Sequence, residues 1–99
     1  MKPAEEPGMN DEKVLTKHPL GKANKPVLKH DYDTFKAAIL SALGRRELTH
    51  TELLNELTKS LKGKFSGNVG WHVMVVKLDL EARKLIERTS SSPQKYRLK

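Results

Sequence analysis

The residue types that most often carry out chemistry in proteins are few and widely spaced in this chain of 99 residues. The chain has no cysteine, which excludes disulfides, zinc–thiolate sites and thiol catalysis. No H-E-x-x-H, paired-carboxylate or G-x-S-x-G motif is present. The histidines show no spacing typical of metal ligands; they are His18, His30, His50 and His72. We therefore expect a protein that is not an enzyme and that uses no metal and no cofactor.

Two further features that resemble functional motifs also have simpler explanations. The segment 63–67, Gly-Lys-Phe-Ser-Gly, superficially looks like a phosphate-binding loop, but it lacks the G-x-x-x-x-G-K-[ST] order that such loops require. His72 has no base or nucleophile near it in the sequence. We expect it to be a partly exposed helical residue.

The charge of the chain indicates what kind of partner it could attract. Lysine and arginine number 19 against 12 acidic residues, which gives a net charge of +7. Such an excess attracts polyanions such as nucleic acid, although it is equally typical of a lysine-rich solvated surface. The longest strongly apolar run, residues 73–76, is far below the roughly 18 residues needed to span a bilayer. The N-terminus shows no apolar secretory signal, so we expect a cytoplasmic protein with no membrane partner.

Two amphipathic segments predict the first two helices. The first begins near Asp33 and is expected to end at Gly44, which can adopt the left-handed conformation that stops a helix. Its apolar positions recur at steps of three and four residues; they are Phe35, Ala38, Ile39, Ala42 and Leu43. The second begins at Thr49, which forms a capping-box pattern with Glu52. Its buried stripe is Leu53, Leu54, Leu57 and Leu61, and Gly63 is expected to end it.

The third predicted helix, residues 68–84, is apolar on two faces. One face should pack on the first two helices; it consists of Val69, Val73, Val76 and Leu80. The other consists of Trp71, Met74, Val75, Leu78 and Ala82. A helix that is apolar nearly all round is normally buried on both sides. The spacing also predicts two i,i+4 ion pairs, Lys77 with Glu81 and Asp79 with Arg83.

The chain ends in a predicted β-hairpin, with strands at 85–88 and 95–98 and a turn at 89–94. Ile86, Tyr96 and Leu98 should point inward. The three helices and this hairpin predict an α+β fold, a winged helix-turn-helix with three helices followed by a C-terminal β-hairpin wing. We place this domain at residues 31–99, after a disordered tail at 1–17 and an extended arm at 18–30. The arm is expected to cover the second apolar face of the third helix, unless two chains pair through that face.

The final third of the chain resembles known winged-helix domains. The segments 76–88 and 92–98 are similar to the end of the N-terminal domain of Mrr-type restriction endonucleases. The chain more closely resembles a family of small stand-alone bacterial winged-helix proteins of unknown function, also at residues 32–33, 51–54 and 70–71. Lys84 stands where such families often have glycine. The resemblance implies the fold and assigns no activity.

Two functions of different classes follow from this expected fold. In the first, the protein is a transcription-regulator-like protein that binds double-stranded DNA with the third helix and the wing. The candidate contact residues are Arg45, Arg46, Lys64, Asn68, His72, Ser90, Ser91, Ser92, Gln94, Lys95 and Arg97. In the second, it is a homodimer or protein-interaction module that uses an apolar face and binds no DNA. That face consists of Trp71, Met74, Val75 and Leu78.

Overall fold

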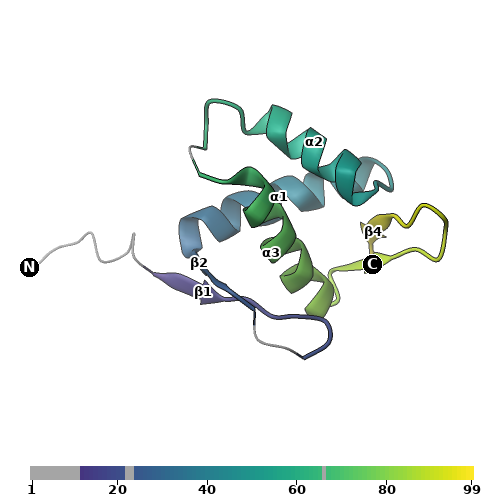
Figure 1. Ribbon diagram of the computed structural model, residues 1–99, viewed down its shortest axis with the longest axis horizontal. Helices are drawn as coiled ribbons and strands as arrows, with labels where there is room; N and C mark the ends of the chain where they lie inside the picture. The colour runs from purple at the N-terminus through teal and green to yellow at the C-terminus, as the bar shows by residue number, and fades with distance from the viewer. Residues whose placement is uncertain (1–11, 22–23, 66) are drawn as a thin grey trace, which may run out of the picture.

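The computed structural model describes residues 12–21, 24–65 and 67–99. They form a small α+β fold of three helices and two small antiparallel hairpins (Figure 1). The elements in chain order are β1 (Lys13–Leu15), β2 (Pro26–Leu28), α1 (Lys29–Arg45), α2 (His50–Ser60), α3 (Val69–Ala82), β3 (Ile86–Arg88) and β4 (Tyr96–Leu98). Most of the predicted N-terminal tail, residues 1–11, lies outside the described residues.

The first helix is longer at both ends than the sequence predicts. It begins at Lys29 because strand β2 runs directly into it: the N–H of Lys29 donates to the carbonyl of Glu12, and its amino group pairs with Asp33 one turn later. The predicted stop at Gly44 is wrong, since α1 continues to Arg45. Gly44 lies within the helix beneath Leu98, where an added Cβ would be 3.8 Å from a Leu98 methyl carbon.

The starts of the other two helices follow from local capping. In α2 the N–H of Glu52 donates to the Thr49 hydroxyl and the Thr49 N–H donates to the Glu52 carboxylate, so the predicted capping box is confirmed. In α3 the side-chain oxygen of Asn68 accepts from the N–H of Trp71 at 2.8 Å. Helix α2 ends at Ser60, and Gly63, with φ of 77°, lies in the turn that follows.

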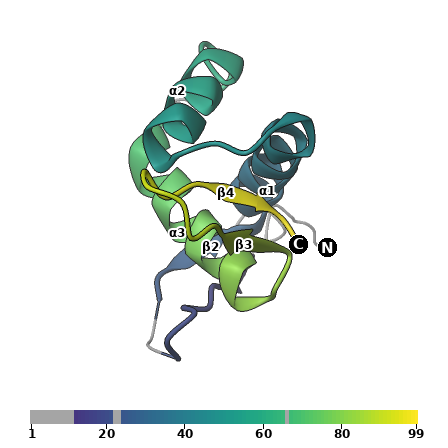
Figure 2. The ribbon, with the colours of Figure 1, turned by 90° about the vertical axis from the view of Figure 1, so that its right-hand side faces the viewer.

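The core lies between the three helices. It also includes Val27 of β2, Ile86 of β3 and Tyr96 of β4. Figures 1 and 2 show α2 on one side of the pair formed by α1 and α3, with the β1–β2 hairpin on the opposite side. The predicted inner face of α3 is confirmed at three of its four positions, because Val73, Val76 and Leu80 are fully buried, while Val69 is half-buried. The most completely buried large side chains are Phe35, Ile39, Leu48, Leu53, Leu57, Leu80 and Ile86.

Strands β1 and β2 pair in an antiparallel hairpin, and we call the described residues 13–21 and 24–28 the N-terminal hairpin. Its register pairs Val14 with Val27, and Val27 is buried in the core. Residues 13–15, in the predicted tail, are thus paired with 26–28, in the predicted arm. The side chains alternate along residues 14–16, as in a strand with one face buried. Val14 packs against the core and Thr16 is buried, while Leu15 between them is 78% exposed.

Residues 86–98 form the C-terminal hairpin, in which Ile86 pairs with Leu98. Leu48, in the α1–α2 connector, adds an isolated antiparallel bridge to Tyr96. Ile86 and Tyr96 point inward as predicted, but Leu98 is 42% exposed. Leu98 lies over Gly44, and because Gly44 has no side chain, nothing at this position covers the outer half of Leu98.

Candidate functional site

The acidic side chains of the described residues are almost all engaged within the fold. Ion pairs hold Asp33, Glu47, Glu56, Asp79, Glu81 and Glu87. Asp31 lies 3.8 Å from Nε2 of His72, and Glu52 forms the capping box. Many cations have no such partner within the described ranges; they are Lys13, Lys17, Lys25, Lys36, Arg46, Lys59, Lys62, Lys64, Lys77, Lys84, Lys95 and Lys99. Among the described residues, the excess positive charge is therefore carried mainly by lysines that have no carboxylate partner within the same residues.

Unpaired cations gather at both ends of α2. Lys59, Lys62 and Lys64 lie in its last turn and in the turn to α3, and all three are exposed. Figure 1 shows this turn and the C-terminal hairpin at opposite ends of α2. Between these ends the outer side of the helix is polar; its exposed residues include Thr51, Asn55 and Thr58. An 11-residue helix spans about 16 Å at 1.5 Å per residue, which separates the two groups of cations.

Arg46 and Lys95 form the second group, at the start of α2. Both lie close enough to Glu52 to affect its carboxyl group. The N–H of Thr49 lowers the pKa of Glu52 most strongly, and the charges of Lys95 and Arg46 lower it further. Two of the predicted DNA-contact residues are thus brought together beside the α2 N-terminus.

Two other arginines among the predicted contact residues are committed to ion pairs. Arg45 reaches Glu56 at 3.4 Å. Arg97 lies 2.8 Å from the Glu87 carboxylate and 3.3 Å from that of Glu47. Because these pairs are exposed, each contributes little to stability. They nevertheless leave these guanidinium groups less free to meet a polyanion than Arg46 or the α2–α3 lysines.

Asn68 and His72 have structural partners at the start of α3. The Asn68 side chain caps the helix, and the backbone carbonyl of Asn68 lies 2.8 Å from Nδ1 of His72. The imidazole stacks on Phe35 with a centroid distance of 5.0 Å, and Nε2 is 3.8 Å from an Asp31 oxygen. His72 is therefore packed among aromatic rings, and the structure does not bring it together with the exposed cations.

The turn of the C-terminal hairpin is polar and exposed. Its predicted contact residues Ser90, Ser91, Ser92 and Gln94 are all exposed. The turn is held by its own hydrogen bonds, since the Thr89 hydroxyl accepts from the N–H of Lys95 at 3.0 Å and lies 2.6 Å from the Ser91 hydroxyl. This arrangement presents hydroxyl and amide groups to solvent beside Lys95.

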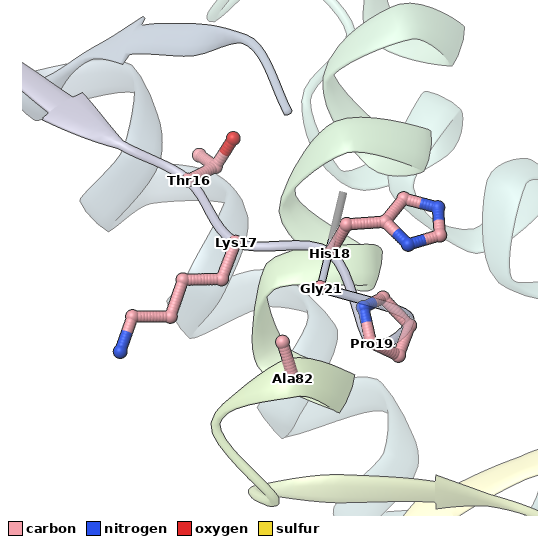
Figure 3. Close-up of a pocket in the computed structure, with 6 residues that line it drawn as sticks. All are labelled: Thr16, Lys17, His18, Pro19, Gly21 and Ala82. Carbon is pink, nitrogen blue, oxygen red and sulfur yellow. The ribbon is translucent and has the colours of Figure 1, made fainter. Parts of the chain in front are cut away.

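The predicted interaction face of α3 is divided by the N-terminal hairpin. Val75 is buried, and its carbonyl accepts from the Asn24 side chain at 3.3 Å. Met74 remains 45% exposed, while Trp71 and Leu78 are half-buried. Figure 3 shows the backbone of residues 16–21 passing over α3 at Ala82, where it encloses a hollow lined by Thr16, Lys17, His18, Pro19, Gly21 and Ala82.

A buried carboxylate fixes this crossing, and the sequence did not indicate it. Asp79 is fully buried and accepts from the N–H of Lys17 at 2.8 Å. It also accepts from the Tyr32 hydroxyl and from Nε of Arg83, so the predicted Asp79–Arg83 pair is confirmed. Burial, together with the Asp79 hydrogen bond and charge, raises the pKa of Tyr32 to about 12. Asp79 therefore joins the N-terminal hairpin, α1 and α3.

The other predicted ion pair of α3 does not form. Lys77 is 5% exposed, and its Nζ lies 3.1 Å from Nδ1 of His50 and 3.0 Å from the Tyr96 hydroxyl. Glu81 pairs instead with Arg88 of the C-terminal hairpin, at 2.5 Å. Spacing along one helix could not reveal these contacts, because both partners of Lys77 come from other elements.

The described residues contain no group of three or more His, Cys, Asp or Glu side chains that could hold a metal ion. Among the helices of these residues, none is both long and apolar enough to cross a membrane. The described residues thus form a small α+β fold of three helices and two hairpins. Residues 13–96 match a family described as Family of unknown function (DUF6958), and the chain belongs to this family.

The family match agrees with the expectation of a small family without an assigned activity. No curated protein and no solved structure gives a significant match to the chain. The comparisons give no support to a relation with Mrr-type restriction endonucleases.

Proposed function

We propose that this protein is a winged-helix protein that binds double-stranded DNA through its phosphates. The observation that carries the proposal is the pattern of charge pairing. Most acidic side chains of the described residues are engaged within the fold, while cations without a carboxylate partner among those residues lie at both ends of α2. They are the exposed Lys59, Lys62 and Lys64 at one end, and the exposed Arg46 with the half-buried Lys95 at the other. Lysines that neutralise phosphates release counterions, which supplies sequence-independent affinity for a duplex.

The order of the elements supports the winged-helix part of the proposal. Strand-like pairing by Leu48 occurs between α1 and α2, and a hairpin follows α3. Winged-helix domains have this order, with the short strand beside the hairpin. In such a domain the C-terminal hairpin is the wing, and its turn carries Ser90, Ser91, Ser92, Gln94 and Lys95. These groups suit contacts with phosphate and sugar.

The proposal is limited to contacts with the backbone of DNA. Base reading in the major groove requires donors and acceptors such as arginine, asparagine or glutamine on the inserted helix. The outer face of α3 offers Trp71, Met74 and Leu78, and Asn68 already caps the helix. We therefore expect the affinities for duplexes of unrelated sequence to be similar.

A charge-matched pair of triple variants tests the proposal. Lys59, Lys62 and Lys64 changed together to glutamine should weaken binding to a 20-base-pair duplex and lower the salt slope by about 0.9 for each phosphate that is no longer neutralised. The control changes Lys13, Lys17 and Lys25 to glutamine, because the N-terminal hairpin lies on the side of the molecule away from α2 (Figures 1 and 2). Equal effects of the two variants would show that net charge alone acts, and the proposed face would be rejected.

A second function is favoured by the exposure of Met74, at 45%, between the half-buried Trp71 and Leu78. An apolar strip of this kind, without a cation, suits contact between proteins. Size-exclusion chromatography coupled to light scattering measures the oligomeric state, which distinguishes this function from DNA binding. Self-association that Met74→Lys abolishes, in a protein without DNA affinity, would favour the interaction module over the DNA-binding protein.

A further inference from the structure

We propose that Lys77 is a positioning residue that holds the wing to the start of α2 only while His50 is uncharged, so that protonation of His50 opens this joint. The inference concerns the coupling of three elements and is independent of whether the protein binds DNA. It assigns a role to a lysine that is buried without a carboxylate.

The geometry sets the hydrogen-bonding roles at the joint. The amino group of Lys77 lies between Nδ1 of His50, at 3.1 Å, and the hydroxyl of Tyr96, at 3.0 Å. It also lies 4.1 Å from the centre of the Tyr96 ring. A lysine ammonium has donors and no acceptor, so Nδ1 of His50 must accept and its single proton must be on Nε2. Lys77 thereby connects α3 to α2 and to β4.

A second proton on His50 has no place in this arrangement. It would put an N–H on Nδ1, facing the Lys77 ammonium, and would create two adjacent cations at a site where Lys77 is buried and His50 is half-buried. Burial lowers the pKa of His50, and the charge of Lys77 lowers it further. The neutral imidazole is thus the form that fits the folded joint.

The charged groups around the joint do not offer His50 a carboxylate. Glu52 of α2 accepts from the N–H of Thr49. Glu81 of α3 binds Arg88 of β3 through both oxygens. Arg88 also lies over the Tyr96 ring, and Lys95 and Arg46 lie beside Glu52. Protonation therefore cannot be compensated locally, and Lys77 has to leave His50.

Movement of Lys77 releases the Tyr96 hydroxyl as well. The backbone of Tyr96 stays paired with Leu48, so the strand end remains attached while the side-chain link between the wing and α2 breaks. The wing and the start of α2 carry Lys95 and Arg46, whose relative positions the joint sets. Acidification should therefore loosen the wing without unfolding the core.

The first experiment follows the imidazole signals by NMR from pH 8 to pH 4.5. His50 should titrate below the usual value of about 6.5, and Lys77→Met should move its midpoint upward towards that value. The ring signals of Phe35 and Phe65, which pack together away from this joint, report whether the variant is folded. Lys64→Met removes an exposed lysine and should leave His50 unchanged. An unchanged His50 midpoint in folded Lys77→Met would overturn the proposal.

The second experiment uses His50→Asn, which keeps an acceptor near the Nδ1 position and cannot titrate. In the wild type the ring signals of Tyr96 should shift with the midpoint of His50, whereas in His50→Asn they should stay constant over the same range. Tyr96 signals that do not move in the wild type, or that move equally in His50→Asn, would reject the joint. This comparison also decides the matter if Lys77→Met does not fold.

Discussion

The backbones of Leu48 and Tyr96 exchange two hydrogen bonds, of 3.1 Å and 2.7 Å, although 48 lies before α2 and 96 lies near the end of the chain. Both side chains are buried, so this pairing joins the connector between α1 and α2 to the core and to β4. One end of the C-terminal hairpin is therefore fixed, while its turn at 89–94 projects into solvent (Figure 1).

Leu80 should be indispensable to the fold. It is fully buried on the inner face of α3, and Leu80→Asp would place an unpaired charge there. Because the total stability of a small domain is only about 5–15 kcal/mol, we expect this variant to be largely unfolded by circular dichroism. Met74→Asp introduces the same charge at an exposed site of the same helix, and its melting temperature should be close to that of the wild type. A wild-type melting curve for Leu80→Asp would refute the assigned core face.

The N-terminal hairpin should stabilise the domain. Val27 is buried and Lys17 donates its N–H to Asp79, so removing residues 1–17 should lower the melting temperature. Within the hairpin, Val27→Ala should cost roughly 1–3 kcal/mol of unfolding free energy, while Leu20→Ala, at a side chain that is 74% exposed, should stay within about 0.5 kcal/mol. Chemical denaturation measures both values. Equal effects at the two positions would show that the hairpin is not docked.

Lys84 should be a site of backbone strain. Its φ of 65° lies in the left-handed region, which costs a residue with a Cβ roughly 1–2 kcal/mol. Lys84→Gly should therefore raise the unfolding free energy by up to about 1 kcal/mol, since part of the gain is offset by the flexibility of glycine in the unfolded chain. Lys84→Ala removes the same charge without relieving the strain and should not stabilise. Equal unfolding free energies of the two variants would show that the backbone at Lys84 is not strained.

Stability should fall on mild acidification because of His50. Its pKa is lowered in the folded state, first by burial and then by Lys77. Below about pH 6.5 the unfolded chain binds a proton that the folded chain does not, so the unfolding free energy decreases until the folded pKa is passed. Denaturation of His50→Asn at pH 7.5, 6.5 and 5.5 should show a smaller decrease than the wild type. An identical pH dependence would contradict this role of His50.

Short-range signals in the sequence predicted the helical part of the fold well. The capping box of Thr49 and Glu52 involves residues three apart and forms as expected. The inner face of α3 also followed directly from its apolar period. The start of α1 was misplaced because it depends on Lys29, whose backbone is held by Glu12 of another segment.

Contacts between distant segments were the part that the sequence could not predict. The spacing of Lys77 and Glu81 indicated a pair, but Lys77 faces Tyr96 and Arg88 binds Glu81. Strand β1 has only three residues, too few for a clear alternating pattern. The candidate contact residues Arg46 and Lys95 lie beside the same carboxylate, Glu52. Lys59 and Lys62, which the proposed surface adds, have in the sequence the pattern of ordinary solvated helix residues.

The measurement that tests the DNA-binding proposal most directly is the affinity of the intact protein for duplex DNA as a function of salt. Fluorescence anisotropy with two 20-base-pair duplexes of unrelated sequence, from 20 to 300 mM salt, would give the slope of log affinity against log salt. We predict similar affinities for both duplexes and a steep negative slope, of about 0.9 for each phosphate contacted. No binding to either duplex at 20 mM salt would contradict the proposed function.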